Sequence, residues 1–419
     1  MATPASPADA PLLGFKEVLK LVPVRRLWIA QLVSIFGDYL AIFGVFTIVP
    51  FQMHGTPAQI AMIFVAYFLP LAVISPLAGV FVDRWNVKAT MIASDLIRAG
   101  LALLLIFATS VEQIYAILFA LSAVSSFFIP AQSVALRAIV PRTGLMSANA
   151  LMSQAIQGMQ IIGPAATTQL VAWFGANPCF WLDSLSFVVS AAMISSISIH
   201  RERSAAPLKL SSVVTEMNTG LKFIFTHAPI SFVMISMTAG MFAIRCYGAL
   251  IAVYIRDILL GGPRMLGTLS SLVGVGMIVG TQFIHRFART RSKNHLVVYG
   301  LLCIGLCIVV LAAVGTVSTT VAMTLGIGFG AAFIMIPSQT LLQEETPHAM
   351  LGRVSSSLMS ALSISQVVAM LFAGSIAQAI GIRNLYFASA ALLVLIAVSG
   401  YAYLQNRARQ QAAGISSTT

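Results

Sequence analysis

The apolar residues of this chain fall into twelve blocks of about twenty residues or more, separated by short stretches rich in Gly, Pro and charge. A helix needs about 20 consecutive apolar residues to cross the hydrocarbon core of a bilayer, whereas buried segments of soluble proteins are shorter or amphipathic. The block length therefore predicts membrane spans. We place them at residues 27–50, 58–82, 89–110, 113–138, 147–173, 179–199, 229–254, 265–287, 295–315, 318–342, 351–380 and 384–404.

The composition agrees, because 58% of the residues are hydrophobic and only 9% are charged, against about 25% charged in soluble domains. The net charge of +12 does not indicate nucleic acid, since the cations lie in short connectors rather than on one basic face. The four cysteines lie in or beside apolar blocks with no metal-ligand spacing. We predict no metal, no cofactor and no nucleic-acid partner.

Cytoplasmic loops of membrane proteins carry an excess of Lys and Arg. Nineteen of the 24 Lys and Arg residues lie on the side shared by the two termini, and three lie on the other side. Residues 1–13 are small, polar and Pro-rich and do not resemble a removable signal peptide. We therefore predict a multi-pass protein of the bacterial inner membrane with both termini in the cytoplasm.

The two halves of the chain also resemble each other. Phe128–Gln132 in span four has a counterpart in Met335–Gln339 of span ten at an offset of about 207 residues, and each is followed by a proline at the span exit, Pro141 and Pro347. We predict an all-α fold of twelve spans in two pseudo-symmetric six-helix bundles, an arrangement typical of alternating-access transporters. The parts are an N-terminal segment (1–26), a bundle (27–199), a cytoplasmic linker (200–228), a bundle (229–404) and a tail (405–419).

Charged residues inside spans cost about 2.5–3.5 kcal/mol each and need a partner, a wet cavity or a function. Asp38 lies in span one and shares a helix face with Gln31 and Ser34. This stripe predicts a central cavity in which Asp38 takes up a proton or meets a cationic substrate; the alternative is a structural Asp that pins span one. Arg245, at the equivalent place in span seven, either faces the same cavity or reaches the outer headgroups.

Two further sets of polar residues stand out. Asp95 and Arg98 lie three residues apart in span three, so they share a face and form either a structural clamp or part of a site. Gln154 and Gln157, followed by Gln160, repeat along one face of span five. These amides hydrogen-bond a substrate or join helices.

A short loop between spans two and three reads Gly79-Val80-Phe81-Val82-Asp83-Arg84-Trp85-Asn86-Val87-Lys88. It resembles the loop signature of the major facilitator superfamily, although Asn86 and Val87 replace the usual Gly and Arg. The resemblance implies a conformational latch made of Gly79, Asp83, Arg84, Lys88, Asp95 and Arg98. In span five, Gly158 through Gly163-Pro164 resembles the antiporter signature of the same superfamily, a helix-kink motif.

More specific is the stretch from Pro130 to Ser190, which includes Leu182-Asp183-Ser184-Leu185-Ser186-Phe187. It resembles the drug:proton antiporter-3 group, which includes macrolide efflux and enterobactin exporter proteins. The resemblance implies a monomeric secondary transporter in the lipid bilayer that exports a small amphiphilic molecule, such as a drug, macrolide-like compound or siderophore, by proton antiport.

Three alternatives remain open at this point. A lipid or lysolipid translocator and a solute importer use the same fold. A membrane-embedded enzyme or a channel is the remote alternative, because the sequence has no nucleophile–base pair, no phosphate-binding loop and no selectivity-filter motif. We therefore predict a protein that is not an enzyme.

Overall fold

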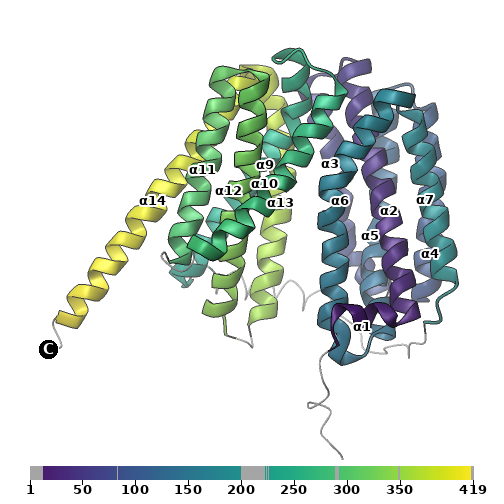
Figure 1. The fold of residues 1–419 in the computed structure, drawn as a ribbon, viewed down its shortest axis with the longest axis horizontal. Helices are drawn as coiled ribbons and strands as arrows, with labels where there is room; N and C mark the ends of the chain where they lie inside the picture. The colour runs from purple at the N-terminus through teal and green to yellow at the C-terminus, as the bar shows by residue number, and fades with distance from the viewer. Residues whose placement is uncertain are drawn as a thin grey trace, which may run out of the picture. The chain divides into compact units, whose positions relative to one another are not determined.

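The computed structural model describes residues 13–82, 84–199, 222, 224, 226–287, 292–347 and 350–416, and within these ranges every regular element is a helix (Figure 1). The first half contains α1 (Phe15–Lys20), α2 (Val22–Thr47), the π-helical turn η1 (Ile48–Gln52), α3 (Pro57–Val82), α4 (Val87–Leu104), the short 3-10 helix η2 (Leu105–Phe107), α5 (Val111–Ile139), a second 3-10 helix η3 (Arg142–Gly144), α6 (Leu145–Phe174) and α7 (Asn177–Ser195). The second half contains α9 (Ala228–Asp257), α10 (Pro263–Phe287), α11 (Lys293–Val314), α12 (Val317–Glu345), α13 (Leu351–Ile380) and α14 (Ile382–Ser416).

Among the described residues, eleven helices are long and apolar enough to cross a membrane. The remaining long helix of the predicted twelve is α6, which has 30 residues but carries Gln154, Gln157 and Gln160 in its middle. Its length matches a span, and its lower hydropathy comes from these amides. The prediction of an all-helical, multi-pass protein is confirmed. The last helix extends beyond its predicted span and continues to Ser416.

Local sequence explains where several helices begin and end. The Asn86 side chain accepts a hydrogen bond from the Ala89 N–H (3.1 Å) and so caps α4, and Ser110 caps α5 in the same way. Gly175 and Gly381 end α6 and α13 with φ values of 80° and 87°. Only glycine adopts this region at low cost. The two glycines occupy equivalent places in the two halves, which supports the internal repeat.

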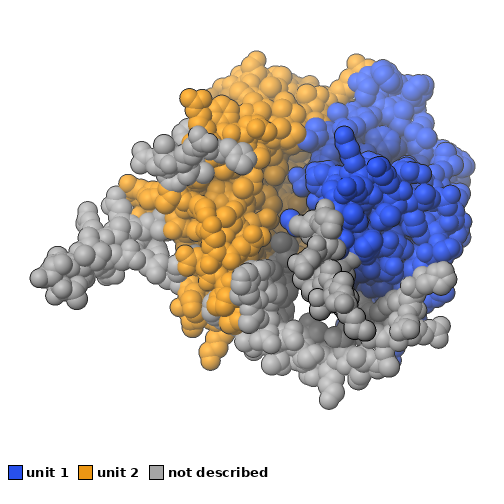
Figure 2. Space-filling view, turned by 60° about the horizontal axis from the view of Figure 1, so that its bottom comes forward, with its two compact units in different colours: residues 1–48, 66–207 blue, residues 49–65, 208–419 orange. Residues whose placement is uncertain are grey.

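The chain divides into two compact units (Figure 2). The first comprises residues 1–48 and 66–207, and the second comprises residues 49–65 and 208–419. The units differ from the predicted bundle boundaries at 49–65, because η1 and the first part of α3 group with the second unit. Most of the predicted linker over 200–228 lies outside the described residues.

Each unit packs its helices by the same scheme. In the first unit α2 contacts α6 and α7, while α4 contacts α5 and α7. In the second unit α9 contacts α13 and α14, while α11 contacts α12 and α14. These pairs correspond one to one along the repeat, and α5 and α12 each contain the internal proline that the repeat aligns, Pro130 and Pro337. Helices α2, α4, α5, α6 and α7 of the first unit thus pack in the same pairs as α9, α11, α12, α13 and α14 of the second.

Small residues allow close contact between helices of the second unit. Gly300 of α11 and Gly330 of α12 face each other, since a Cβ on either would lie 2.8–2.9 Å from the other's carbonyl oxygen. Such close approach is how membrane helices gain van der Waals contact without a hydrophobic driving force. Arg256 at the end of α9 donates hydrogen bonds to the carbonyls of Pro50 (3.0 Å) and Gly55 (2.8 Å). It thereby holds the connection between η1 and α3.

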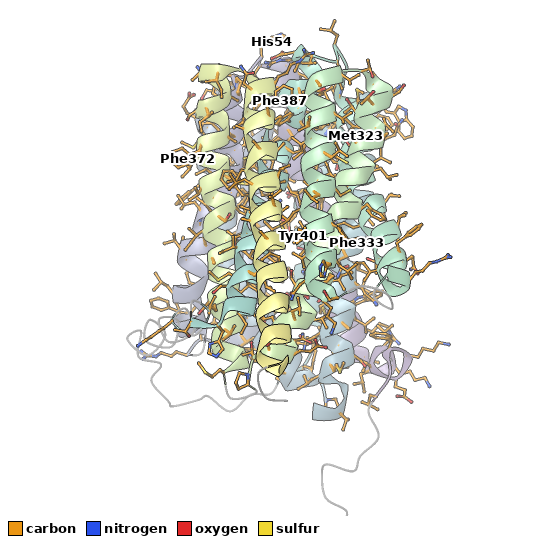
Figure 3. All side chains as sticks on the ribbon, turned by 90° about the vertical axis from the view of Figure 1, so that its left-hand side faces the viewer. His54, Met323, Phe333, Phe372, Phe387 and Tyr401 are labelled. Atoms are coloured by element: carbon orange, nitrogen blue, oxygen red, sulfur yellow. The ribbon has the colours of Figure 1, made fainter. Side chains whose placement is uncertain are left out.

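Large apolar side chains cover the outer surfaces of the helices. Phe372 on α13 is 54% exposed and Phe387 on α14 is 39% exposed, and both are labelled in Figure 3. On a soluble protein such a surface would drive association. Around transmembrane helices it is the surface expected to meet lipid tails.

Candidate functional site

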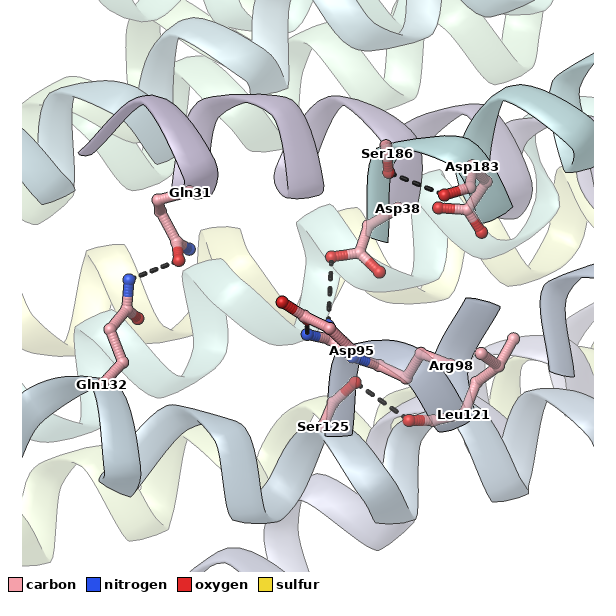
Figure 4. A network of polar contacts seen from close by, with 9 residues as sticks. All are labelled: Gln31, Asp38, Asp95, Arg98, Leu121, Ser125, Gln132, Asp183 and Ser186. Atoms are coloured by element: carbon pink, nitrogen blue, oxygen red, sulfur yellow. Dashed lines mark hydrogen bonds and ion pairs between the residues drawn. The ribbon is translucent and has the colours of Figure 1, made fainter. Parts of the chain in front are cut away.

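The first unit contains a buried arginine at the centre of a charged cluster (Figure 4). Arg98 lies in the fourth helical turn of α4 and is 3% exposed. Its guanidinium carbon lies 4.6 Å from the ring centroid of Phe128 on α5 and 4.3 Å from that of Phe187 on α7. Aromatic faces attract cations at these distances, and more strongly away from water. The two rings therefore hold the arginine in place between three helices.

Carboxylates from two helices contact this guanidinium. Asp95, one turn earlier on α4, forms an ion pair and a hydrogen bond with Nη2 of Arg98. Asp38 on α2 has its Oδ2 4.0 Å from Nη1 of Arg98. Asp95 is fully buried, whereas the side chain of Asp38 is 30% exposed. Asp38 is thus the accessible member of the cluster and Asp95 is the buried one.

A third carboxylate belongs to the same cluster. Asp183 on α7 is 1% exposed, and Figure 4 shows it beside Asp38. It reaches this place because Gly37, the residue before Asp38, has no side chain: a Cβ there would lie 2.6 Å from Oδ1 of Asp183. Three carboxylates therefore surround one guanidinium, so the cluster carries excess negative charge if all four groups are ionised.

Hydrogen bonding within this cluster is incomplete. Oδ2 of Asp95, Oδ1 of Asp183 and Nε of Arg98 are buried and make no hydrogen bond to other described residues. Buried polar atoms without partners are rare in proteins and concentrate where function requires them. We also find no group of three His, Cys, Asp or Glu side chains placed as in a metal site within the described part of the chain.

The predicted polar stripe on α2 is only partly continuous with the cluster. Gln31 accepts a hydrogen bond from Nε2 of Gln132 on α5, which joins two helices of the first unit. Ser34 is 3% exposed and therefore buried. Gln154 and Gln157 are exposed on α6. Gln31 and Gln132 thus join two helices, whereas Gln154 and Gln157 are exposed. Contact of these amides with a substrate stays a prediction.

The helix-kink residues on α6 have two different environments. Pro164 lies inside α6, and a Cβ on the preceding Gly163 would lie 2.5 Å from the ring of Tyr39 on α2. Thr167, one turn on, donates a hydrogen bond to the Tyr39 carbonyl (3.2 Å). Gly158, by contrast, has no atom within 4 Å of the place where its Cβ would lie. Gly163 is therefore required for the α2–α6 contact, and Gly158 is not.

Of the six predicted latch residues, the structure describes the surroundings of Arg84, Lys88, Asp95 and Arg98, and the latch itself stays a prediction. Asp83 lies outside the described residues, and Gly79 is described only as part of α3. Arg84 is exposed in the turn after α3. The Lys88 ammonium donates a hydrogen bond to the carbonyl of Ser195 at the end of α7 (2.5 Å). Asp95 and Arg98 lie two or more turns deeper in α4, with Asp38.

Arg245, the other predicted cavity residue, lies in α9 of the second unit and is partly exposed. Its approach to Asp38, which belongs to the first unit, stays a prediction.

Residues 27–366 match the family model described as the Major Facilitator Superfamily. The chain belongs to the major facilitator superfamily. Among its curated relatives, the MFS-type transporter YfiS of Bacillus subtilis (strain 168) is 25% identical and aligns over 88% of this chain and 89% of its own. Macrolide efflux protein A of Streptococcus pyogenes is 23% identical over 89% and 93%, and the multidrug efflux pump Tap of Mycolicibacterium fortuitum is 23% identical over 90% and 94%.

Solved structures of major facilitator proteins share the fold. A POT family transporter in complex with a thioalcohol-conjugated peptide superposes with a TM-score of 0.72 at 11% identity, covering 91% of this chain and 96% of that one. The nucleoside transporter NupG gives 0.70 at 10% identity, covering 90% and 98%. At such identities the likeness concerns the fold alone.

Asp183 is the residue of this major facilitator site that sequence reasoning did not select. It falls inside the predicted span 179–199, where the cost of a charged group should have marked it as it marked Asp38. In the sequence analysis Asp183 appears only as part of Leu182–Phe187, the stretch that carries the family resemblance. In the sequence, Phe128 stands out only as part of the internal repeat, and Phe187 only as part of the Leu182–Phe187 stretch. The structure places both rings against Arg98.

Proposed function

We propose that this transporter exports a small amphiphilic molecule across the bacterial inner membrane in exchange for protons, with both termini in the cytoplasm. The observation that carries the proposal is the position of Asp38, which is 30% exposed and yet 4.0 Å from the buried Arg98. A coupling group must be reachable by protons and must also change the energy of a buried element. The exposure of Asp38 and its distance from Arg98 support this role.

The chemistry follows from the charge of this pair. Ionised Asp38 attracts Arg98 toward α2, and a proton on Asp38 removes that attraction and leaves Arg98 with Asp95. A protonation event at an accessible site therefore changes which helices the guanidinium joins. A ligand shifts a conformational equilibrium only through such a difference in interaction energy between states. A cationic group of a substrate near Asp38 would compete for the same carboxylate.

The direction of transport rests on relatives whose names state efflux, namely macrolide efflux protein A and the multidrug pump Tap. The exposed amides Gln154 and Gln157 supply donors and acceptors suited to a molecule rich in hydroxyl and carbonyl groups. Small molecules, protons and membrane lipids are the proposed partners, and the proposed working unit is a monomer.

The test is accumulation in an efflux-deficient bacterial host. Cells expressing the chain are loaded with fluorescent dyes, macrolides or catecholate siderophores, with and without a protonophore. We expect lower accumulation of at least one compound, and we expect the protonophore to abolish the difference. Export that resists the protonophore would contradict proton coupling, and no export of any compound would favour lysolipid translocation or import.

The variant Asp38→Asn assigns the coupling group. It should lose protonophore-sensitive export while reaching the membrane in normal amount, because Asn keeps the shape of Asp but binds no proton. Glu112→Gln is the matched control, since Glu112 is an exposed carboxylate in the first turn of α5, away from Arg98. Normal export by Asp38→Asn in proteoliposomes with an imposed pH gradient would remove Asp38 from this role.

A further inference from the structure

Asp183 is a buried acid of the first unit, 1% exposed, and no ion pair to it is found among the described residues. Its side chain is enclosed between α7 and the backbone of α2, where Gly37 leaves room for it. Its Oδ1 makes no hydrogen bond to other described residues. The nearby hydroxyl of Ser186 donates to the backbone carbonyl of Asp183 (2.7 Å) rather than to its carboxylate. Oδ1 of this carboxyl group therefore has no hydrogen-bond donor among the described residues to stabilise a negative charge.

The positive charge of Arg98 is already paired with carboxylates other than Asp183. Arg98 forms an ion pair with Asp95 and has Asp38 as its second carboxylate neighbour, and no ion pair between Arg98 and Asp183 is found among the described residues. A buried charge without a partner is strongly unfavourable, and a carboxyl group escapes the penalty by binding a proton. The groups of the first unit that interact with Asp183 are Asp38 and Gly37 on α2, Tyr67 on α3, Arg98 on α4, and Cys179 and Ser186 on α7. Asp95 belongs to the same cluster through its ion pair with Arg98.

The charges of Arg98 and Asp183 are also not needed to pack α4 against α7. In the second unit α11 and α14 make the contact that corresponds to the contact between α4 and α7. At the offset of the repeat, Gly305 and Ala390 stand for Arg98 and Asp183, and a Cβ on Gly305 would lie 3.5 Å from the Ala390 carbonyl. A shift of one residue gives Ile304 and Ser389, which are also uncharged. No ion pair joins this second helix pair among the residues that the structure describes.

We propose that Asp183 is a proton-binding site: it holds a proton at neutral pH and passes it to Asp38. In this step the O–H bond of Asp183 breaks, an O–H bond forms on the Asp38 carboxylate, and the net charge of the cluster does not change. Asp38, being 30% exposed, then exchanges the proton with water. The inference rests on the proposed proton coupling, to which it adds a buried store behind the accessible carboxylate.

The test observes the proton directly and does not depend on transport. The full chain is purified in lipid nanodiscs after labelling with aspartate carrying ¹³C at the side-chain carboxyl carbon. The infrared carbonyl stretch of protonated aspartic acid is separate from the bands of ionised carboxylates, and it moves on ¹³C labelling. Wild type at neutral pH should show this band, Asp183→Asn should lose it, and Glu112→Gln should keep it.

Each outcome decides the proposal. Absence of the band in wild type overturns it without any variant, so the test does not depend on the folding of Asp183→Asn. A band that survives in Asp183→Asn and disappears in Asp38→Asn also overturns it, because the proton then belongs to Asp38 alone. If Asp183→Asn loses the band but no compound is exported, the proton site stands and the proposed function fails. If export is protonophore-sensitive and Asp183 shows no proton, only this inference fails.

Discussion

Replacing Arg98 by Met tests whether the charged cluster stabilises the first unit as the geometry indicates. The substitution keeps a long side chain between the rings of Phe128 and Phe187 but removes the charge that neutralises Asp95. Removing one partner of a buried ion pair costs about 3–5 kcal/mol, because the other charge is left without compensation. Since 1 kcal/mol shifts the melting temperature of a unit this size by about 2–4 °C, the loss should be roughly 6–20 °C.

The measurement is thermal unfolding followed by tryptophan fluorescence in detergent. All four tryptophans of the chain lie between residues 28 and 181, so the signal reports mainly on the first unit. Arg84→Met is the control, because Arg84 is exposed and its loss should change stability by no more than about 0.5 kcal/mol. Lowering the pH should restore part of the stability of Arg98→Met, since a proton on Asp95 removes the stranded charge.

The double variant Arg98→Met with Asp95→Leu separates charge from packing. Replacing both partners of a buried pair by apolar groups is often neutral or stabilising. We therefore expect the double variant to melt well above Arg98→Met, with a coupling energy of about 1–3 kcal/mol in the double-mutant cycle. The reasoning is refuted if Arg98→Met melts within about 2 °C of wild type, a shift that corresponds to less than about 1 kcal/mol.

Two further substitutions test other contacts. Gly163→Leu should prevent correct folding, because even a Cβ at this position would lie 2.5 Å from the ring of Tyr39, whereas Gly158→Leu should be tolerated. Size-exclusion chromatography compares the monodispersity of the two variants, and equal behaviour would contradict the packing argument. Arg256→Gln should lose hydrogen bonds of about 1.5–3 kcal/mol to two carbonyls, that of Pro50 in η1 and that of Gly55 in the connection to α3. Chymotrypsin should then cut faster after Phe51 in η1, and an unchanged cleavage rate would show that Arg256 does not hold this segment.

The span pattern was predictable because the bilayer imposes one length on every helix that crosses it. The repeat was predictable for a related reason: equivalent helices need their prolines and end glycines at equivalent places, as Pro130 and Pro337 show. The π-helical turn over Ile48–Gln52 was not predictable, since the apolar run of span one continues through it without a break. Nor did hydropathy show that residues 49–65 group with the second unit, which depends on contacts distant in sequence.

The candidate site was less accessible to prediction than the fold. The cost of intramembrane charge selected Asp38, Asp95 and Arg98 one by one, and helical spacing related Asp95 to Arg98. No spacing rule relates α2, α4 and α7, because their neighbourhood is set by three-dimensional packing. Two features therefore depend on the folded structure: Asp38 lies beside Arg98, and Asp183 fits against Gly37.

The two units share a packing scheme but are stabilised differently at their centres. The second unit joins its helices through buried tyrosines: the hydroxyl of Tyr254 donates to the carbonyl of Leu311 (2.7 Å), and that of Tyr386 donates to the carbonyl of Tyr247 (3.3 Å). These bonds are neutral and keep their strength whatever the pH below the range where tyrosine ionises. The first unit instead places ionisable acids around one arginine, an arrangement whose energy depends on bound protons. Because α11 and α14 pack together with Gly305 and Ala390 at the positions of Arg98 and Asp183, this helix contact does not need their charges. The cluster around Arg98 is therefore better explained by the proton coupling proposed for it than by stability.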